Sequence, residues 1–415
     1  MATRSNPARR PFDVVLYGAT GFVGRQTVAY FAEHAGGLKW AVAGRSADKL
    51  EAVRAACGAG ARGAGLIVAD ADDAGALNTL AAQARVVLST AGPFALYGSA
   101  LVAACVEHAT HYVDITGETP WVRDMIDRHH QRAGANGARI IPCCGFDSVP
   151  SDLGALLVAQ ALWRRRREPC VSVKASFSLR GGLNGGTLAS VLNILNSGER
   201  KRLADPFLLN PPETRPQDVR AHADPVAPHN DAELKAWVGP FFMGPINTRV
   251  VRRSAALLTT SGKAGAYAGD FAYQEYLRFG RGPAAVLAAA GMSIGMGMGK
   301  GAMLFGPARR VAAALALAPG KGPSARAMDN GSFRCELVAT GARGATMRGC
   351  IAGKGDPGNR ATTKFACESA FALVQDGSAL PGGAKYGGVL TPASGIGMVL
   401  ARRLRAAGMT VEPED

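Results

Sequence analysis

The sequence predicts an α/β protein that begins with a doubly wound parallel sheet and continues into a second, α+β domain. Three observations lead to this prediction. Apolar runs of strand type alternate with helix-period segments from residue 12 to residue 144. A glycine-rich turn follows the first of these runs, and the alternation ends after Gly145. Strands that alternate with helices in this way form parallel sheets with right-handed crossovers.

The strand-like runs of the first part are short, apolar and bounded by turn residues. They lie at residues 14–17, 40–43, 66–68, 86–88, 111–115 and 139–142. Apolar residues at helical spacing fill the connections, at residues 23–34, 47–56, 99–108 and 121–133, with a further helical segment between the third and fourth strands. Because so many units agree, we expect one parallel sheet built from these runs.

The rest of the chain has a different rhythm. A helical segment at 151–165 leads to a run at 170–177, whose apolar and polar residues alternate as in a half-buried strand. Residues 205–228 are rich in Pro, Asp and Arg, which predicts an exposed loop. The later segments are strand-like pieces of an antiparallel sheet at 333–339 and 345–351, and a closing amphipathic helix at 396–407.

Composition narrows the range of partners. The chain has 415 residues, 47% of them hydrophobic and 19% charged, as expected for a globular protein of more than one domain. Its formal net charge of +15 suits a nucleic acid, an anionic membrane or an acidic protein partner. The arginines form short clusters without interleaved aromatic residues. We therefore expect a solvated basic surface and no nucleic-acid partner.

Cysteine and histidine spacing predicts no metal site. The eight cysteines include no CxxC, the seven histidines are dispersed, and neither HExxH nor GxSxG occurs. A chain of this length does not need disulfides, so the thiols are expected to be reduced. The charged start is not followed by the apolar stretch of a secretory signal, which favours a cytoplasmic location.

Residues 282–299 stand apart because they carry no charge, with Arg281 before them and Lys300 after. Their length approaches that of a membrane span, but several of them are Gly or Pro. We favour a buried or loosely ordered segment. A hairpin that touches lipid, and with it membrane association, is the first alternative, and a true span is the second.

The sharpest local signal is the glycine-rich turn after the first strand. Gly18 permits the tight turn, Gly21 lets the backbone approach a pyrophosphate, and Gly24 lets the next helix pack closely. The start of that helix offers N–H groups to phosphates. The spacing GxxGxxG occurs often in NADP-dependent proteins. We therefore expect NADP(H) at Gly18, Thr20, Gly21, Phe22, Val23 and Gly24.

The end of the second strand favours NADP over NAD. An NAD site would place Asp or Glu there for the ribose, whereas this chain has Arg45 and Ser46, with Lys49 one helical turn later. Arg45 can bind a 2′-phosphate in bidentate fashion, and Ser46 can both cap the helix and donate to the phosphate. The alternative is that Arg45 lies on the adenine face without any phosphate preference.

Two later loops complete the expected cofactor site. Asp70 ends the third strand, where it can accept from the adenine amino group or cap the next helix; both interpretations stay open. The loop after the fourth strand lies beside the nicotinamide ribose in a doubly wound sheet. We expect its backbone to contact the cofactor at Thr90, Ala91, Gly92 and Pro93.

Several longer motifs carry a family resemblance. They lie at residues 92–98 (GPFALYG), 111–118 (HYVDITGE), 144–154 (CGFDSVPSDLG), 185–187 with Ser190, and 387–392 (GGVLTP). In these motifs the chain resembles the saccharopine dehydrogenase-like oxidoreductases, in the branch of the trans-acting enoyl reductases. The resemblance runs from the first strand to the C-terminal helix.

This resemblance implies a Rossmann domain, an inserted α+β domain, and a C-terminal segment that packs back on the first domain. On this chain we place them at residues 11–150, 151–380 and 381–410, with the middle domain serving for substrate or dimerisation. The resemblance also implies an NADP-type cofactor, and reduction of an enoyl double bond on an acyl chain that a partner synthase carries.

Candidate catalytic residues are Tyr97, Tyr112, Asp147 and Ser148, which together with His111 are expected near the carboxyl edge of the strands. A Tyr or Ser hydroxyl could donate to the substrate oxygen, and Asp147 could hold or orient it. Each has a purely structural interpretation as well. His111 and Tyr112 could pack at the strand entrance. Asp114 and Glu118 could bind backbone amides, and Ser148 or Ser151 could cap a helix that has Pro150 in its first turn.

The leading hypothesis is an NADPH-dependent oxidoreductase that reduces an enoyl group of a lipid or polyketide acyl chain. Its partner would be an acidic acyl-carrier or polyketide synthase protein, to which a basic surface is suited. Two alternatives stay open: a non-catalytic nucleotide-binding scaffold associated with lipid, and an amino-acid dehydrogenase of the saccharopine type. A homodimer also stays open.

Overall fold

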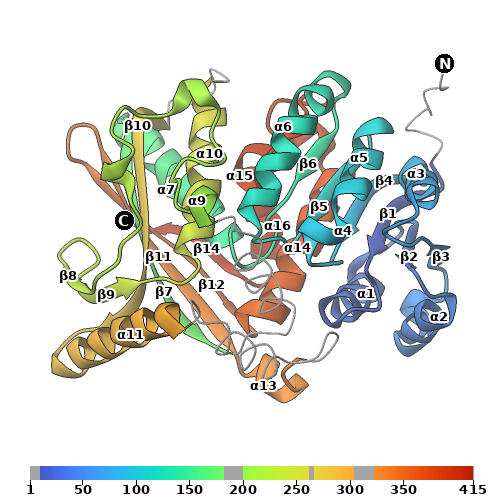
Figure 1. Cartoon of the computed structure of the whole chain (residues 1–415), viewed down its shortest axis with the longest axis horizontal. Helices are drawn as coiled ribbons and strands as arrows, with labels where there is room; N and C mark the ends of the chain where they lie inside the picture. The colour runs from blue at the N-terminus through green and yellow to red at the C-terminus, as the bar shows by residue number, and fades with distance from the viewer. Residues whose placement is uncertain (1–9, 182–199, 261–265, 303–321, 415) are drawn as a thin grey trace.

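The computed structural model describes residues 10–181, 200–260, 266–302 and 322–414 (Figure 1). Its first sheet is parallel and seven-stranded, with the order β13-β6-β5-β4-β1-β2-β3. The strands are β1 (Phe12–Tyr17), β2 (Trp40–Gly44), β3 (Gly65–Val68), β4 (Ala84–Ser89), β5 (His111–Asp114), β6 (Arg139–Ile141) and β13 (Gly388–Val389). The doubly wound parallel sheet is confirmed, and a late strand joins its edge.

Helices cover both faces of this sheet. They are α1 (Phe22–His34), α2 (Ala47–Ala56), α3 (Ala74–Gln83), α4 (Phe94–Tyr97), α5 (Ser99–Glu107), α6 (Thr119–Asn136) and, from much later in the chain, α14 (Thr362–Gln375). Leu16 belongs to the same buried cluster as Phe31 of α1 and Phe365 of α14, whereas its neighbour Tyr17 belongs to a second cluster with Leu101 of α5. Burial on both faces explains why the strands are continuous apolar runs.

The second sheet also has seven strands, in the order β14-β12-β11-β7-β10-β9-β8. They are β7 (Cys170–Arg180), β8 (His229–Asp231), β9 (Ala236–Pro240), β10 (Tyr267–Gly280), β11 (Ser332–Gly341), β12 (Thr346–Lys354) and β14 (Thr410–Glu414). The segments expected at 333–339 and 345–351 do pair antiparallel, as β11 and β12, but the sheet as a whole is mixed because β7 and β10 run parallel. A parallel pair needs a long crossover connection, and the chain between them contains α10 (Gly244–Thr260).

Helix α7 (Val149–Arg166) leads from the end of β6 to the second sheet. It packs on β7, β11 and β12 and lies against α10. Gly154 allows this close approach, since an added Cβ there would lie 2.8 Å from a methyl carbon of Leu337 in β11. The helix is buried along nearly its whole length and ends in a run of exposed arginines.

The segment at 205–228 is only partly the exposed loop that we expected. Short helical turns, η3 (Pro212–Thr214) and η4 (Arg220–His222), follow a buried stretch at 207–210. Three buried arginines of α10 hold the segment and the residues before it. Arg249 donates to the carbonyl of Leu203, Arg252 to that of Pro206, and Arg253 to that of Leu209. The proline-rich composition led us to expect exposure, but the backbone carbonyls of this segment accept hydrogen bonds from buried guanidinium groups.

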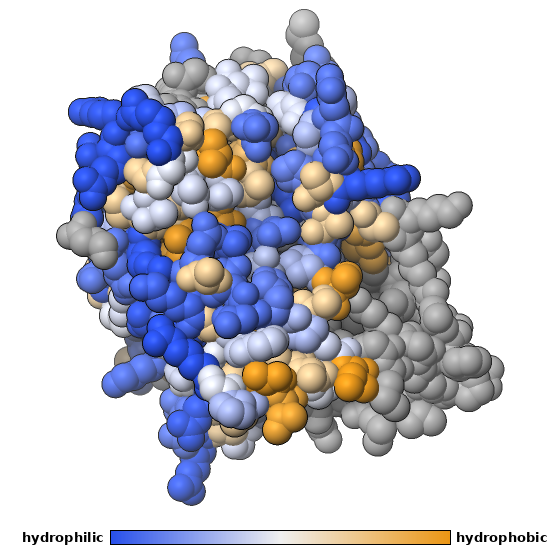
Figure 2. All heavy atoms as spheres, turned by 90° about the vertical axis from the view of Figure 1, so that its left-hand side faces the viewer, coloured by the Kyte–Doolittle hydropathy of each residue, from blue (hydrophilic) through white to orange (hydrophobic). Residues whose placement is uncertain are grey.

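The uncharged segment forms helix α11 (Pro283–Ala302), which packs on β9 and β10. We expected a buried or loosely ordered segment, whereas the structure has a regular helix that is only partly buried. Ala285 and Ala289 are buried, whereas Leu287 is 75% and Ile294 63% exposed. Figure 2 shows apolar side chains gathered at the lower end of the face on which α11 lies. Among the described residues, no helix has both the length and the apolar character that crossing a bilayer requires.

The C-terminal part touches both sheets. β13 pairs with β6 of the first sheet, and β14 pairs with β12 of the second. Between them lie α15 (Pro392–Gly395) and α16 (Met398–Ala406), the second of which corresponds to the closing helix expected at 396–407. The domain limits at residues 150 and 380 stay a prediction.

Arg139 of β6 binds the C-terminal segment. Its side chain is buried, and its guanidinium group donates to the carbonyls of Gly395 at 2.6 Å, Pro381 at 2.8 Å and Gly383 at 2.7 Å. Burial lowers the pKa of Arg139 to about 10. The guanidinium group also lies 5.3 Å from the centre of the Tyr386 ring.

We expect Arg139→Leu to lower the free energy of unfolding by roughly 2–5 kcal/mol, because three backbone carbonyls lose a charged donor. Urea denaturation would measure the change. The control is Arg402→Leu, which removes an exposed ion pair with Asp376 and should cost less than about 1 kcal/mol. Equal losses in the two variants would contradict the anchoring role of Arg139.

Candidate functional site

The turn between β1 and α1 forms a cradle of backbone atoms. Gly18 has a φ of 81°, which favours glycine. An added Cβ at Gly24 would overlap the carbonyl oxygen of Gly18, so the helix can approach the turn only with glycine there. Gly21 is the N-cap of α1 and offers no capping side chain. The first N–H groups of the helix can therefore bind the phosphates of a dinucleotide.

The other residues of this turn have distinct environments. Thr20 and Phe22 are half-buried, whereas the Val23 side chain is buried, so Val23 can offer only its backbone. Phe22 also contacts the second half of the chain, because an added Cβ at Gly322 would overlap its ring. The segment that follows the second sheet's β10 and α11 thus returns to the expected cofactor site.

Two cations lie where a 2′-phosphate would be recognised. Arg45 follows β2 directly, Lys49 lies in the first turn of α2, and both side chains are exposed. Among the described residues, neither has an ion-pair partner. The Ser46 hydroxyl accepts from the Lys49 N–H at 3.5 Å, so Ser46 caps α2 as expected. This donor set fits a phosphate monoester.

Asp70 does not cap the next helix. Its carboxylate accepts from the N–H of Asp72 at 3.1 Å, while Asp73 is the N-cap of α3 and accepts from Ala76 at 2.9 Å. The capping interpretation of Asp70 is therefore wrong, because the helix starts three residues later than it required. Contact between Asp70 and adenine stays a prediction.

The loop after β4 lies against the glycine-rich turn. Thr90 donates through its hydroxyl to the carbonyl of Gly18 at 3.2 Å, and an added Cβ at Gly18 would lie 2.8 Å from the Ala91 nitrogen. The cis bond between Gly92 and Pro93 follows. Farther along, the carboxylate of Glu118 accepts from the N–H groups of residues 94 and 95 at 2.8 and 3.0 Å. Backbone binding by Glu118 is thus the interpretation that the structure supports.

Strand β5 corrects the expected position of two candidates. It runs from His111 to Asp114, so His111 and Tyr112 lie at its amino end and only Asp114 reaches the carboxyl edge. The His111 ring accepts from the Arg139 N–H at 3.1 Å, and burial followed by nearby arginines lowers its pKa to about 4. Burial, with Asp114 close by, raises the pKa of Tyr112 well above its usual value. Both are packing residues at the strand entrance.

Asp114 organises the two loops at the carboxyl edge. One carboxylate oxygen accepts from the N–H groups of Thr116 and Cys143, each at 3.0 Å. Burial raises the pKa of Asp114 to about 7, although these two bonds oppose the shift. The loop after β5 is thereby held against the loop after β6, which carries Asp147.

Asp147 lies half-buried at the carboxyl edge, and burial raises the pKa of its carboxyl group to about 6. An added Cβ at Gly117, after β5, would lie 3.8 Å from Asp147 Oδ2 and 3.2 Å from Ile246 Cδ1. No hydrogen bond or ion pair engages this carboxyl group within the part of the chain that the structure describes. The Asp147 carboxyl group therefore lies close to Gly117 of the loop after β5 and to Ile246 at the start of α10.

The other two candidates differ in exposure. Tyr97 ends α4, and its side chain is 41% exposed. Ser148 occupies the N-cap position of α7, but its hydroxyl makes no capping bond and instead donates to Asn247 Oδ1 of α10 at 3.2 Å. Pro150 lies in the first turn of α7, as expected. The expected site residues 185–187 and Ser190 lie outside the described residues. Within those that are described, no cluster of His, Cys, Asp and Glu could bind a metal ion.

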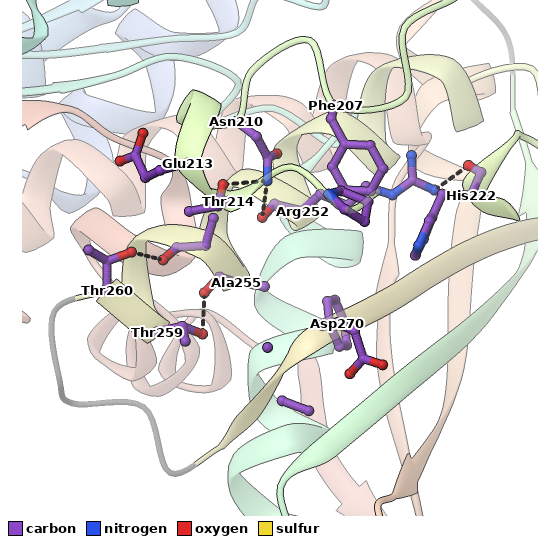
Figure 3. A pocket seen from close by; sticks show the side chains of 15 residues that line it. Phe207, Asn210, Glu213, Thr214, His222, Arg252, Ala255, Thr259, Thr260 and Asp270 are labelled. Atoms are coloured by element: carbon purple, nitrogen blue, oxygen red, sulfur yellow. Dashed lines mark hydrogen bonds between the residues drawn. The ribbon is translucent and has the colours of Figure 1, made fainter. Parts of the chain in front are cut away.

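A cavity of about 230 Å³ lies elsewhere, between the segment at 207–222, the last turns of α10 and the start of β10. Figure 3 shows Asp270 and His222 on the side opposite Thr259 and Thr260. None of the expected site residues lines it. The residues of α10 that approach the expected site, Ile246 and Asn247, lie at the other end of this helix. Sequence reasoning missed both, because nothing in a single sequence pairs them with Gly117 or Ser148.

Comparisons with known proteins agree with this architecture. The sequence of residues 14–141 matches the protein family described as the saccharopine dehydrogenase NADP binding domain. A Mycobacterium tuberculosis protein provisionally named a trans-acting enoyl reductase is 40% identical over 97% of both chains. The trans-acting enoyl reductase of Mycobacterium bovis is 37% identical over 98% of both. The structure of saccharopine dehydrogenase (L-Glu forming) from Saccharomyces cerevisiae superposes with a TM-score of 0.51 at 15% identity, covering 97% of this chain and 99% of that one.

We expect Arg45→Ala to weaken NADPH binding by roughly 1–3 kcal/mol and NADH binding much less, since only NADPH carries the 2′-phosphate. Fluorescence titration with both cofactors would measure the difference. Arg62→Ala is the matched control, because Arg62 is also exposed but precedes β3, at the amino ends of the strands, whereas Arg45 follows the carboxyl end of β2. An equal loss for NADPH and NADH would argue that Arg45 stacks on the adenine instead.

We expect Gly21→Val to abolish cofactor binding while the protein still folds. An added Cβ at Gly21 would lie 3.3 Å from the Gly18 carbonyl, which the turn can accommodate, but a branched side chain would occupy the phosphate position. Circular dichroism and the same titration would test both statements. Gly63→Val, at an exposed site with open space around it, should bind NADPH normally. If Gly21→Val bound NADPH with unchanged affinity, the glycine-rich turn would not be the phosphate-binding site.

Proposed function

Because the chain belongs to the saccharopine dehydrogenase-like family, in the branch of the trans-acting enoyl reductases, we propose that it reduces an enoyl double bond in a lipid or polyketide acyl chain. It is an NADP(H)-dependent oxidoreductase. The names of its relatives support the enoyl group and a separate synthase that carries the acyl chain. The likeness to the yeast saccharopine dehydrogenase is one of fold alone and does not argue for an amino-acid substrate.

One observation carries the mechanistic part of the proposal. The Asp147 carboxyl group has a raised pKa, lacks a partner among the described residues, and lies close to Gly117 and Ile246, where we place the substrate. A carboxylic acid whose pKa is raised towards neutral pH is suited to act as a general acid. Its partial exposure lets solvent return the proton after each turnover.

When bound, NADPH supplies the hydride that adds to the β-carbon of the enoyl thioester. The electron pair of the double bond then moves to the α-carbon, which takes the proton of the Asp147 carboxyl group. We assign the donor for the thioester oxygen to the exposed hydroxyl of Tyr97, since Ser148 already donates to Asn247. Tyr112 has no part in this scheme because its side chain is fully buried.

The surface favours an apolar acyl chain and an acidic carrier. Ile246 lies close to Gly117, where we place the substrate, and the side chain of Phe242, just before α10, is 45% exposed. The net charge of +15 would attract an acidic acyl-carrier protein at long range. Contact with a membrane and formation of a homodimer stay predictions from the sequence.

We expect Asp147→Asn to lower kcat about 10²- to 10⁴-fold, because an amide cannot donate the proton that the α-carbon takes. NADPH oxidation with an enoyl thioester, free and loaded on an acyl-carrier protein, would measure it. Since the protonated acid is the active form, kcat of the natural protein should fall as pH rises above about 6, the pKa of Asp147. That decrease should be missing from Asp147→Asn.

The control for this experiment is Asp270→Asn, which changes an exposed carboxylate at the separate cavity and should leave kcat unchanged. The affinity for NADPH should be the same in all three proteins. A fully active Asp147→Asn variant with an unaltered pH profile would assign the proton to another group.

A further inference from the structure

Glu275 is a buried carboxylic acid of the second sheet. It lies in β10, and its side chain is only 1% exposed. Burial raises the pKa of Glu275 to about 8, although three hydrogen bonds from neighbouring side chains oppose the shift. Burying a carboxyl group costs free energy unless its oxygens are hydrogen-bonded, and a fully bonded buried network fixes the positions of its members.

The contacts of Glu275 fall into two groups. Its Oε2 atom accepts from the hydroxyl of Ser151 at 2.7 Å and from that of Tyr273 at 2.9 Å. Its Oε1 atom accepts from the side-chain amide of Asn247 at 2.7 Å. The first group lies within the core, whereas the second leads towards the expected active site.

The bond to Glu275 sets the orientation of the Asn247 amide. Because the NH₂ group of Asn247 donates to Glu275, its Oδ1 atom must point away, and there it accepts from the hydroxyl of Ser148 at 3.2 Å. A continuous chain of hydrogen bonds thus leads from β10 through α10 to the residue at which α7 begins. Ser148 is buried, so this bond is shielded from water.

This chain of bonds ends beside the candidate acid. Ser148 directly follows Asp147, and Asn247 directly follows Ile246, which lies close to Gly117 as the Asp147 carboxyl group does. We propose that Glu275 and Asn247 are positioning residues, which hold Ser148 and thereby aim the Asp147 carboxyl group at the substrate. The inference rests on the proposed role of Asp147 as the proton donor.

Four variants test the two groups of contacts separately. Glu275→Leu and Asn247→Leu break the link to Ser148, and kcat should fall roughly 10- to 100-fold, as expected for a misplaced catalytic group. The KM for the enoyl thioester and the Kd for NADPH should stay the same. Tyr273→Phe and Ser151→Ala remove the other donors to the same carboxylate, and both should keep kcat within about threefold.

The conservative variant Glu275→Gln should retain kcat, because it can keep the hydrogen bond to Asn247. In Glu275→Gln the amide oxygen can still accept from Asn247, while its NH₂ group can donate to the hydroxyls of Ser151 and Tyr273. We expect kcat within about threefold of the natural value, with the decrease above pH 6 retained. Should Glu275→Leu not fold, Asn247→Leu tests the same link, because it leaves the bonds of Ser151 and Tyr273 intact.

The outcomes separate this inference from the proposed function. Loss of kcat in Asn247→Leu, with retention in Tyr273→Phe and Glu275→Gln, supports the positioning role. Equal losses of kcat in Asn247→Leu and Tyr273→Phe would overturn the positioning role, and so would a fully active Asn247→Leu. In either case a strong loss of kcat in Asp147→Asn would still support Asp147 as the proton donor. A fully active Asp147→Asn would overturn both.

Discussion

The architecture depends on hydrogen bonds to the polar side chains that α7 buries. This helix leaves the first sheet and packs across the second. Ser151 donates to Glu275 of β10, while Asp152 accepts from the Ser254 hydroxyl of α10 and from the N–H of Ala393 at 2.7 Å. Burial raises the pKa of Asp152 to about 7. Each of these bonds joins α7 to a different part of the chain. These bonds join α7 to the second sheet and to the C-terminal segment and satisfy polar groups that the helix buries.

The same constraint explains how a site forms between distant segments. The loops after β5 and β6 are joined through Asp114, the C-terminal segment is joined to β6 through Arg139, and α10 is joined to the start of α7 through Ser148. Hydrogen bonds between buried polar groups are directional, so they fix relative positions that apolar packing alone leaves adjustable. The links through Asp114 and Ser148 lie at the carboxyl edge beside Asp147, whereas the link through Arg139 lies at the amino end of β6.

Much of the first domain could be predicted from the sequence, and less of the second. The glycine-rich turn, Arg45 and the capping Ser46 are local features, and local chemistry was enough to place them. His111 and Tyr112 were misplaced because strand boundaries are uncertain by several residues, and here that error moves a side chain from one edge of the sheet to the other. The mixed second sheet was missed because alternation along a strand does not reveal the direction of its neighbour.

By itself the sequence determined the class of the protein: a parallel sheet, a glycine-rich dinucleotide turn, and motifs of an oxidoreductase family. These are properties of short segments, whose periodicity and turn chemistry act within a few residues. Only the tertiary structure decided which carboxylic acid faces the expected substrate space and which ones bind backbone amides. Asp114, Asp147 and Glu275 look alike in the sequence. They differ because burial and hydrogen-bond partners come from elements that are far apart along the chain.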